Sequence, residues 1–169
     1  PKEYNGYKVY GEDGAQLSPE SAAKVSAYMA KADIFADVLR CDCEKAIKEG
    51  GITLLGEDFD KIYLSRVICE AVDKSAVPAV ADSLKIVYTP LHGAGYKLVP
   101  EVLRAIGFKQ LLTVEEQMTP NGDFPTVKKP NPELEDAFAM GIALAEREGS
   151  DLVLATDPDC DRVGAMSRD

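Results

Sequence analysis

The feature that most constrains the fold is an alternation of apolar and helix-like segments between residues 84 and 155. Three short apolar runs, typical of buried strands, occupy residues 84–88, 110–114 and 151–155. Two helix-like segments lie between them, at about 96–106 and 132–148. Each of these ends at a glycine in the usual C-cap position, Gly107 and Gly149. This β-α-β-α-β order predicts a three-layer α/β/α fold with a mostly parallel or mixed sheet and helices on both faces.

The first part of the chain predicts smaller elements. Residues 4–10 are typical of a strand, and a turn at 11–14 is expected to lead into a second short strand at 15–17. Ser18 and Pro19 are suited to the N-cap and first position of a helix, which is expected to reach about Val38. The weakly patterned residues 39–56 follow, and then a helix is expected from Asp58 to about Asp73.

Composition excludes several classes of function. A net charge of −10 argues against non-specific binding to nucleic acid and to anionic membranes. No apolar run approaches the roughly 20 residues that span a bilayer. The four cysteines have no zinc-site spacing, and the single histidine excludes a two-histidine metal site. We therefore expect a cytoplasmic protein with reduced thiols.

A loop with three aspartates directly follows the last apolar run. Asp157, Asp159 and Asp161 alternate with other residues, so that their side chains can converge on one point. Converging carboxylates suit a hard divalent cation such as Mg²⁺, and without a cation they would repel one another. Arg162 adds a planar cation suited to a phosphate or a carboxylate. The pattern predicts a magnesium site with an arginine for phosphate.

Other kinds of aspartate-rich loop require particular residues at particular positions. An EF-hand that began at Asp157 would need glycine and glutamate where Arg162 and Arg168 stand, which excludes it. A haloacid-dehalogenase-like phosphatase would use Asp157 as its nucleophile, although Asp161 interrupts the usual D-x-D-x-T/V pattern. That phosphatase and a non-catalytic divalent-cation-binding module are the two alternatives.

A second candidate site residue is His92, in the glycine-bearing loop 89–95 after the first apolar run. Ligands of such sheets bind beyond the carboxyl ends of the strands, where this loop and the aspartate loop are both expected. His92 is a candidate phosphate-binding residue beside Gly93, and structural support of the loop is the alternative. The polar segment 115–131 is long for a simple connection, so we expect it to be functional or folded over the surface.

Several motifs resemble those of the α-D-phosphohexomutases, the family of phosphoglucomutases and phosphomannomutases. Residues 157–162, Asp-Pro-Asp-Cys-Asp-Arg, are similar to the family's magnesium loop D-G-D-G-D-R. Residues 1–8 are similar to the sequence that follows the family's phosphoserine loop, T-A-S-H-N-P. Three further segments, at 89–95, 124–127 and 130–133, resemble one branch of the family. That branch contains phosphopentomutase-like and glucose-bisphosphate-synthase-like enzymes.

This resemblance implies an isomerase that moves a phosphate between C1 and C6 of a hexose, or C5 of a pentose, through an enzyme phosphoserine and a sugar bisphosphate. It implies Mg²⁺ held by Asp157, Asp159 and Asp161. It also implies catalytic roles for Arg162, which would contact phosphate, and for Lys8, which would transfer a proton. The implied substrates are glucose 1-phosphate, mannose 1-phosphate or ribose 1-phosphate, with an activator of the glucose 1,6-bisphosphate type.

The resemblance further implies that the sequence is one piece of a longer enzyme, whose other domains would be its partners. Residues 1–40 would be the end of the phosphoserine domain, 41–83 a connecting helical segment, and 84–169 the α/β domain that carries the metal loop. Because the family's serine is expected three positions before Pro1, we expect the isolated chain to have no mutase activity.

Overall fold

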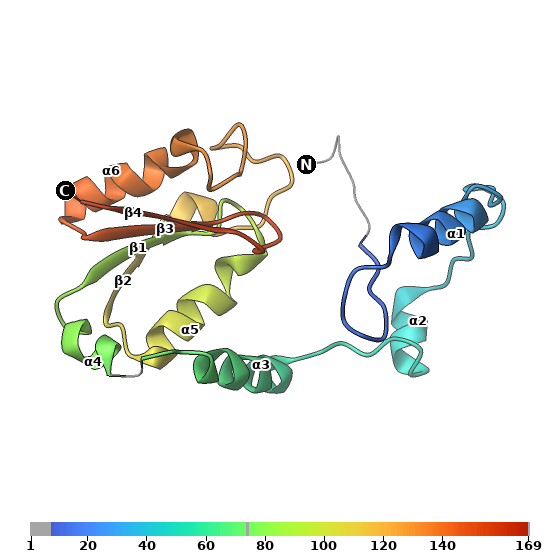
Figure 1. The fold of residues 1–169 in the computed structure, drawn as a ribbon, viewed down its shortest axis with the longest axis horizontal. Helices are drawn as coiled ribbons and strands as arrows, with labels where there is room; N and C mark the ends of the chain where they lie inside the picture. The colour runs from blue at the N-terminus through green and yellow to red at the C-terminus, as the bar shows by residue number, and fades with distance from the viewer. Residues whose placement is uncertain (1–7, 74, 169) are drawn as a thin grey trace. The chain divides into compact units, whose positions relative to one another are not determined.

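The computed structural model describes residues 8–73 and 75–168, which divide into two compact units (Figure 1). The described residues up to Leu55 form the smaller unit, and those from Gly56 onward form the larger one. The boundary lies within the segment 41–83, which the sequence predicts to be a connection between domains.

The larger unit is built on a four-stranded sheet. Its strands are β1 (Lys85–Thr89), β2 (Gln110–Thr113), β3 (Leu152–Thr156) and β4 (Val163–Ser167). They lie in the order β2-β1-β3-β4, with β1 parallel to both β2 and β3, and β3 antiparallel to β4. The predicted α/β fold with a mixed, mostly parallel sheet is confirmed.

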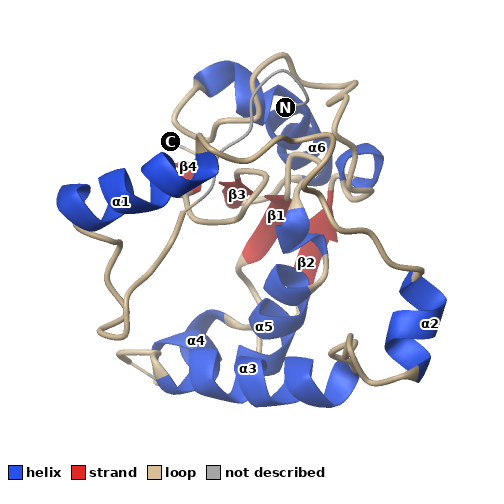
Figure 2. Cartoon of the chain, turned by 90° about the vertical axis from the view of Figure 1, so that its right-hand side faces the viewer, coloured by secondary structure: helices blue, strands red, loops and turns tan. Residues whose placement is uncertain are grey.

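Helices cover both faces of this sheet (Figures 1 and 2). The helices of this unit are α3 (Glu57–Cys69), α4 (Ala76–Val80), α5 (Leu98–Ile106) and α6 (Ala139–Glu148), with short 3₁₀ turns η1 (Ala94–Tyr96), η2 (Glu115–Gln117) and η3 (Glu135–Phe138). Helix α6 packs on β1 and β3, whereas α5 lies on the opposite face, beside α3. No helix of the described residues is long and apolar enough to cross a membrane.

The core of the larger unit lies on both faces of β1. Residues 86–89 are all buried, with Val87 in the core that faces α6 and Ile86 among the largest buried side chains. On α6, Gly141 allows close packing, because a Cβ at this position would lie 2.7 Å from Val153 Cγ1. An inner strand covered on both faces is expected to be continuously apolar, which explains why the sequence reveals it.

The smaller unit contains helices α1 (Pro19–Met29) and α2 (Cys43–Lys48). The predicted start of α1 is confirmed, since Ser18 Oγ accepts the backbone N–H of Ser21 and Pro19 occupies the first helical turn. Ahead of it, Tyr10 and Gln16 form an antiparallel bridge, as the predicted turn requires. Residues 4–7 of the predicted first strand lie outside the described residues.

The predicted extension of α1 to about Val38 is wrong, because the helix ends at Met29. The carboxylate of Asp33 accepts the backbone N–H groups of Phe35 and Ala36 at 2.8 and 3.0 Å. Such side-chain contacts offer the backbone an alternative to helical hydrogen bonds.

The predicted helix at 132–148 begins later than expected. Asn131 Oδ1 accepts the backbone N–H of Glu133 at 3.0 Å, and the backbone oxygen of Asn131 accepts the N–H of Leu134. These bonds form a turn before η3, and α6 begins only at Ala139. The helix predicted at 58–73 is likewise shorter, since α3 ends at Cys69.

Candidate metal and phosphate site

The aspartate loop connects β3 to β4 at the carboxyl end of β3. The backbone N–H of Cys160 donates to the carbonyl oxygen of Asp157 at 3.0 Å, which makes a tight turn. Cys160 has a φ of 61°, in the left-handed region where glycine is the usual residue. The turn folds the loop back, so that alternate side chains come together.

The three aspartates of the loop converge. One carboxylate oxygen from each of Asp157, Asp159 and Asp161 lies within 4.8 Å of the other two. Ligand oxygens around one Mg²⁺ are about 3–4 Å apart, given metal–oxygen distances of about 2.1 Å, so a small inward movement would let all three bind one ion. The three carboxylates therefore fit the Mg²⁺ ion that the sequence predicts. Binding of Mg²⁺ by these residues stays a prediction.

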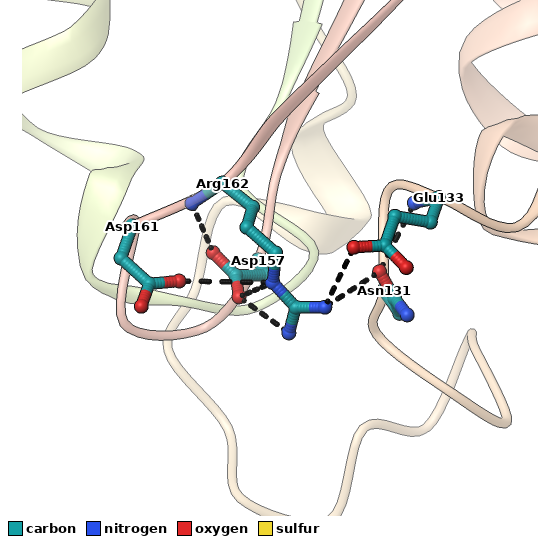
Figure 3. A network of polar contacts seen from close by, with 5 residues as sticks. All are labelled: Asn131, Glu133, Asp157, Asp161 and Arg162. Carbon is teal, nitrogen blue, oxygen red and sulfur yellow. Dashed lines mark hydrogen bonds and ion pairs between the residues drawn. The ribbon is translucent and has the colours of Figure 1, made fainter.

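Arg162 lies at the centre of a polar network around this cluster (Figure 3). Its backbone N–H donates to Asp157 Oδ1 at 3.0 Å, and its Nε and Nη2 lie 2.9 and 2.8 Å from Asp157 Oδ2. Its Nη1 donates to Asn131 Oδ1 at 3.1 Å and to Glu133 Oε1 at 3.3 Å. The guanidinium is thus held between the aspartate loop and the segment that precedes η3.

Burial and charge act in opposite directions on Asp157, whose side chain is only 1% exposed. Burial by itself raises the pKa of the Asp157 carboxyl, but the backbone N–H and the guanidinium of Arg162 stabilise the carboxylate. The net result is a pKa of Asp157 below its ordinary value. Hydrogen bonds to Asp157 and then to Glu133 raise the pKa of Arg162, so both partners are charged at neutral pH.

The low pKa of Asp157 predicts an acid-dependent loss of stability. A group whose pKa is lower in the folded state contributes its full stabilisation above its unfolded pKa, about 3.9 for Asp, and loses it as the pH falls through the folded value. We expect the free energy of unfolding to fall less steeply below about pH 4 in Asp157→Asn than in the wild type. Urea unfolding between pH 7 and pH 3 measures this, and identical pH profiles would contradict it.

His92 lies in the loop after β1 and is 4% exposed. Its Nδ1 is 3.0 Å from the carbonyl oxygen of Thr119, and its Nε2 is 2.8 Å from Thr126 Oγ1. A carbonyl oxygen can only accept, so Nδ1 carries a proton. In the tautomer with this single proton, Nε2 accepts from the hydroxyl of Thr126. Both ring nitrogens are therefore engaged within the protein.

The His92 loop and the aspartate loop are in direct contact. The backbone N–H of Ala94 donates to the carbonyl oxygen of Pro158 at 2.8 Å. A Cβ at Gly93 would lie 2.4 Å from Pro158 Cα, so only glycine permits this approach. Loops that follow the neighbouring parallel strands β1 and β3 are expected to meet in this way.

One predicted site residue lies in the smaller unit, and several residues of the polar network were not foreseen. Lys8 is exposed and belongs to the smaller unit, so its catalytic role remains a prediction. The sequence alone predicts no role for Asn131, Glu133, Gln117 or Thr126. Two signals in the sequence contained them: the unusually long segment 115–131 includes Gln117, Thr126 and Asn131, and the motif at 130–133 includes Glu133.

Comparison with known proteins gives consistent matches. Residues 62–169 match the family described as phosphoglucomutase/phosphomannomutase, alpha/beta/alpha domain II. A phosphoglucomutase from Staphylococcus saprophyticus is 36% identical over 169 residues, which cover 99% of this chain and 30% of that protein. Phosphoglucomutases from Staphylococcus epidermidis RP62A and Staphylococcus aureus USA300 are 37% and 36% identical to this chain. Both matches cover 100% of this chain, and they cover 30% and 29% of the two relatives. The chain therefore spans about 30% of the length of these curated relatives.

Proposed function

The chain belongs to the phosphoglucomutase/phosphomannomutase family, and we propose that it is the metal-loop part of a phosphosugar mutase. The observation that carries this proposal is the convergence of Asp157, Asp159 and Asp161 beside Arg162 at the carboxyl end of β3. This is the edge of an α/β sheet at which ligands bind. The proposed reaction moves a phosphate between two hydroxyls of a sugar phosphate, by way of a phosphoserine outside this sequence.

The three carboxylates would hold Mg²⁺. When bound, this ion supplies positive charge that stabilises the transferring phosphoryl group. Asp157 keeps acceptor capacity for it, because a carboxylate has about four lone-pair sites and Arg162 makes three contacts with this one. Asp159 and Asp161 are exposed, so their oxygens are accessible to an ion that approaches from solvent.

Arg162 is proposed to bind a phosphate of the substrate or of the phosphoserine. Its guanidinium is half exposed, and its contact with Glu133 is a solvent-exposed ion pair, which contributes little to stability. A phosphate could therefore replace Glu133 on Nη1 while Asp157 keeps the guanidinium in place. Lys8 is proposed as the proton-transfer residue on the resemblance of residues 1–8 alone.

The geometry argues against the phosphatase alternative. A nucleophilic aspartate needs a carboxylate oxygen that the phosphorus can reach. Asp157 is almost completely buried, and both of its oxygens accept hydrogen bonds from Arg162. A hydrogen-bonded carboxylate can still bind a cation through a remaining lone pair, so we propose Asp157 as a metal ligand rather than as the nucleophile.

The test is a coupled mutase assay on a longer protein that contains these residues. We expect interconversion of the 1-phosphate of glucose, mannose or ribose with its isomer, dependent on Mg²⁺ and reduced at least about tenfold in Asp159→Asn. The isolated 169-residue chain should show no turnover.

Two results would contradict the proposal. Turnover by the pure 169-residue chain would show that no upstream serine is needed. A longer protein that binds Mg²⁺ but converts none of the three sugars would favour the non-catalytic cation-binding module.

A further inference from the structure

We propose that His92 is a positioning residue, which acts with Gln117 and Thr126 to fix the backbone turn that supports the aspartate loop. The proposal assigns its side chain to the protein interior rather than to a phosphate. Only the part of its test that measures metal binding rests on the proposed function.

The first observation is a continuous chain of side-chain hydrogen bonds that begins at the end of β1. Thr89 Oγ1 accepts the backbone N–H of Leu91 at 3.1 Å and donates to Gln117 Oε1 at 2.6 Å. Gln117 Nε2 donates to Thr126 Oγ1 at 2.9 Å, and Thr126 Oγ1 lies 2.8 Å from His92 Nε2. Thr89, Gln117 and His92 are each at least 96% buried, and the bond between Thr89 and Gln117 is shielded from water. Thr126 is itself exposed, so its bonds to Gln117 and His92 are only partly buried.

The directions of these bonds are mutually consistent. The Gln117 amide nitrogen can only donate, so the Thr126 hydroxyl accepts from it and directs its own hydrogen to His92 Nε2. His92 Nδ1–H then donates to the carbonyl oxygen of Thr119. Polar networks in which every member is satisfied favour one rigid arrangement, and three of the four residues of this network are buried.

Backbone bonds tie the same two segments together. The N–H of His92 donates to the carbonyl oxygen of Gln117 at 3.0 Å, and the carbonyl of His92 accepts the N–H of Asn121 at 3.1 Å. The segment after β2 is therefore attached to His92 through its backbone as well as its ring. A loop held at so many points is suited to positioning.

The turn that these contacts hold is strained. Leu91 and His92 have φ values of 48° and 63°, so two consecutive residues that are not glycine adopt the left-handed region. This conformation costs free energy for each of them, because the Cβ comes too close to a backbone carbonyl oxygen. The burial of Leu91 and the hydrogen bonds of His92 offset this cost.

The strained turn directs the next residues against the aspartate loop. Gly93 contacts the backbone of Pro158, and Ala94 N–H bonds to its carbonyl oxygen. A Cβ at Gly95 would lie 2.8 Å from Thr156 Oγ1 and 3.0 Å from Cys160 Sγ, so contact continues along the loop. A shift of the turn would therefore move the backbone that carries the aspartates.

The experiment uses Thr126→Val in the 169-residue chain, which removes the hydroxyl between His92 and Gln117 without changing the size of the side chain. Thr119→Val is the matched control, because it makes the same change but keeps the carbonyl that His92 uses. NMR measures the hydrogen exchange of the Ala94 amide, and a Mn²⁺ titration measures the affinity of the aspartates.

We expect Ala94 exchange to be at least about tenfold faster and Mn²⁺ affinity about tenfold lower in Thr126→Val, with both unchanged in Thr119→Val. His92→Asn should have the same effects, since Asn tolerates a positive φ but lacks the reach of the ring. In the wild-type chain, ¹⁵N shifts should show His92 protonated at Nδ1 rather than at Nε2.

Changes confined to residues 116–127, with Ala94 exchange unaltered, would overturn the proposal, as would the Nε2–H tautomer in the wild type. If the wild-type chain binds no Mn²⁺, the proposed metal site fails. The Ala94 exchange and the His92 tautomer then decide the positioning role by themselves.

Discussion

Gly93→Ala is expected to destabilise the larger unit and to disturb the aspartate loop at the same time. The new Cβ would lie 2.4 Å from Pro158 Cα, 2.7 Å from the Pro158 carbonyl oxygen and 2.9 Å from that of Asp157. All three atoms belong to the backbone, so no side chain can turn away to make room. Steric overpacking of this kind costs about 1–3 kcal/mol.

Thermal unfolding and Mn²⁺ titration measure the two effects on the same protein. The matched control is Gly122→Ala, because a Cβ at Gly122 would meet nothing within 4 Å. We expect the control to keep the Tm and the Mn²⁺ affinity of the wild type, whereas Gly93→Ala lowers both. A Gly93→Ala protein that is as stable as the control would show that the two loops do not pack as described.

The elements that were predicted correctly are those whose residues are determined by their immediate surroundings. The inner strand β1 is covered on both faces, which requires an apolar run that can be recognised in the sequence. The ends of α5 and α6 are marked by Gly107 and Gly149, whose φ values of 120° and 66° suit glycine.

Predictions failed where a polar side chain redirected the backbone. Asp33 binds the N–H groups that a longer α1 would need, and Asn131 holds a turn where α6 was expected to begin. Strand β4 was not predicted, because its residues are at most half-buried and it is defined by its pairing with β3. Its Gly164 packs against Pro132, a contact that no local pattern reveals.

The candidate site likewise has one part that the sequence predicts and one part that it does not. The alternation of aspartates in a short loop was enough to predict that their side chains converge, and they do. The contacts of Arg162 with Asn131 and Glu133 join residues 31 and 29 positions apart. Such contacts depend on how the segment before η3 returns over the sheet, which sequence periodicity does not determine.

A large and specific loss of metal binding is expected for Asp159→Asn. Asp159 is exposed, so replacing its carboxylate with an amide leaves the core intact, whereas Asp157→Asn would also remove the buried ion-pair partner of Arg162. The amide keeps an oxygen but loses the negative charge that a hard cation prefers. We expect Mn²⁺ and Mg²⁺ affinities to fall at least about tenfold, or about 1.4 kcal/mol, with the Tm of the metal-free chain unchanged.

Asp136→Asn, an exposed aspartate on η3, makes the same change of charge outside the cluster and should keep the wild-type affinity. Isothermal titration of both variants separates a specific site from general attraction of cations to a chain of net charge −10. Equal losses in the two variants would mean that only the overall charge matters. A loss confined to Asp159→Asn would mean that the loop acts as one site, because a diffuse attraction does not depend on which carboxylate is removed.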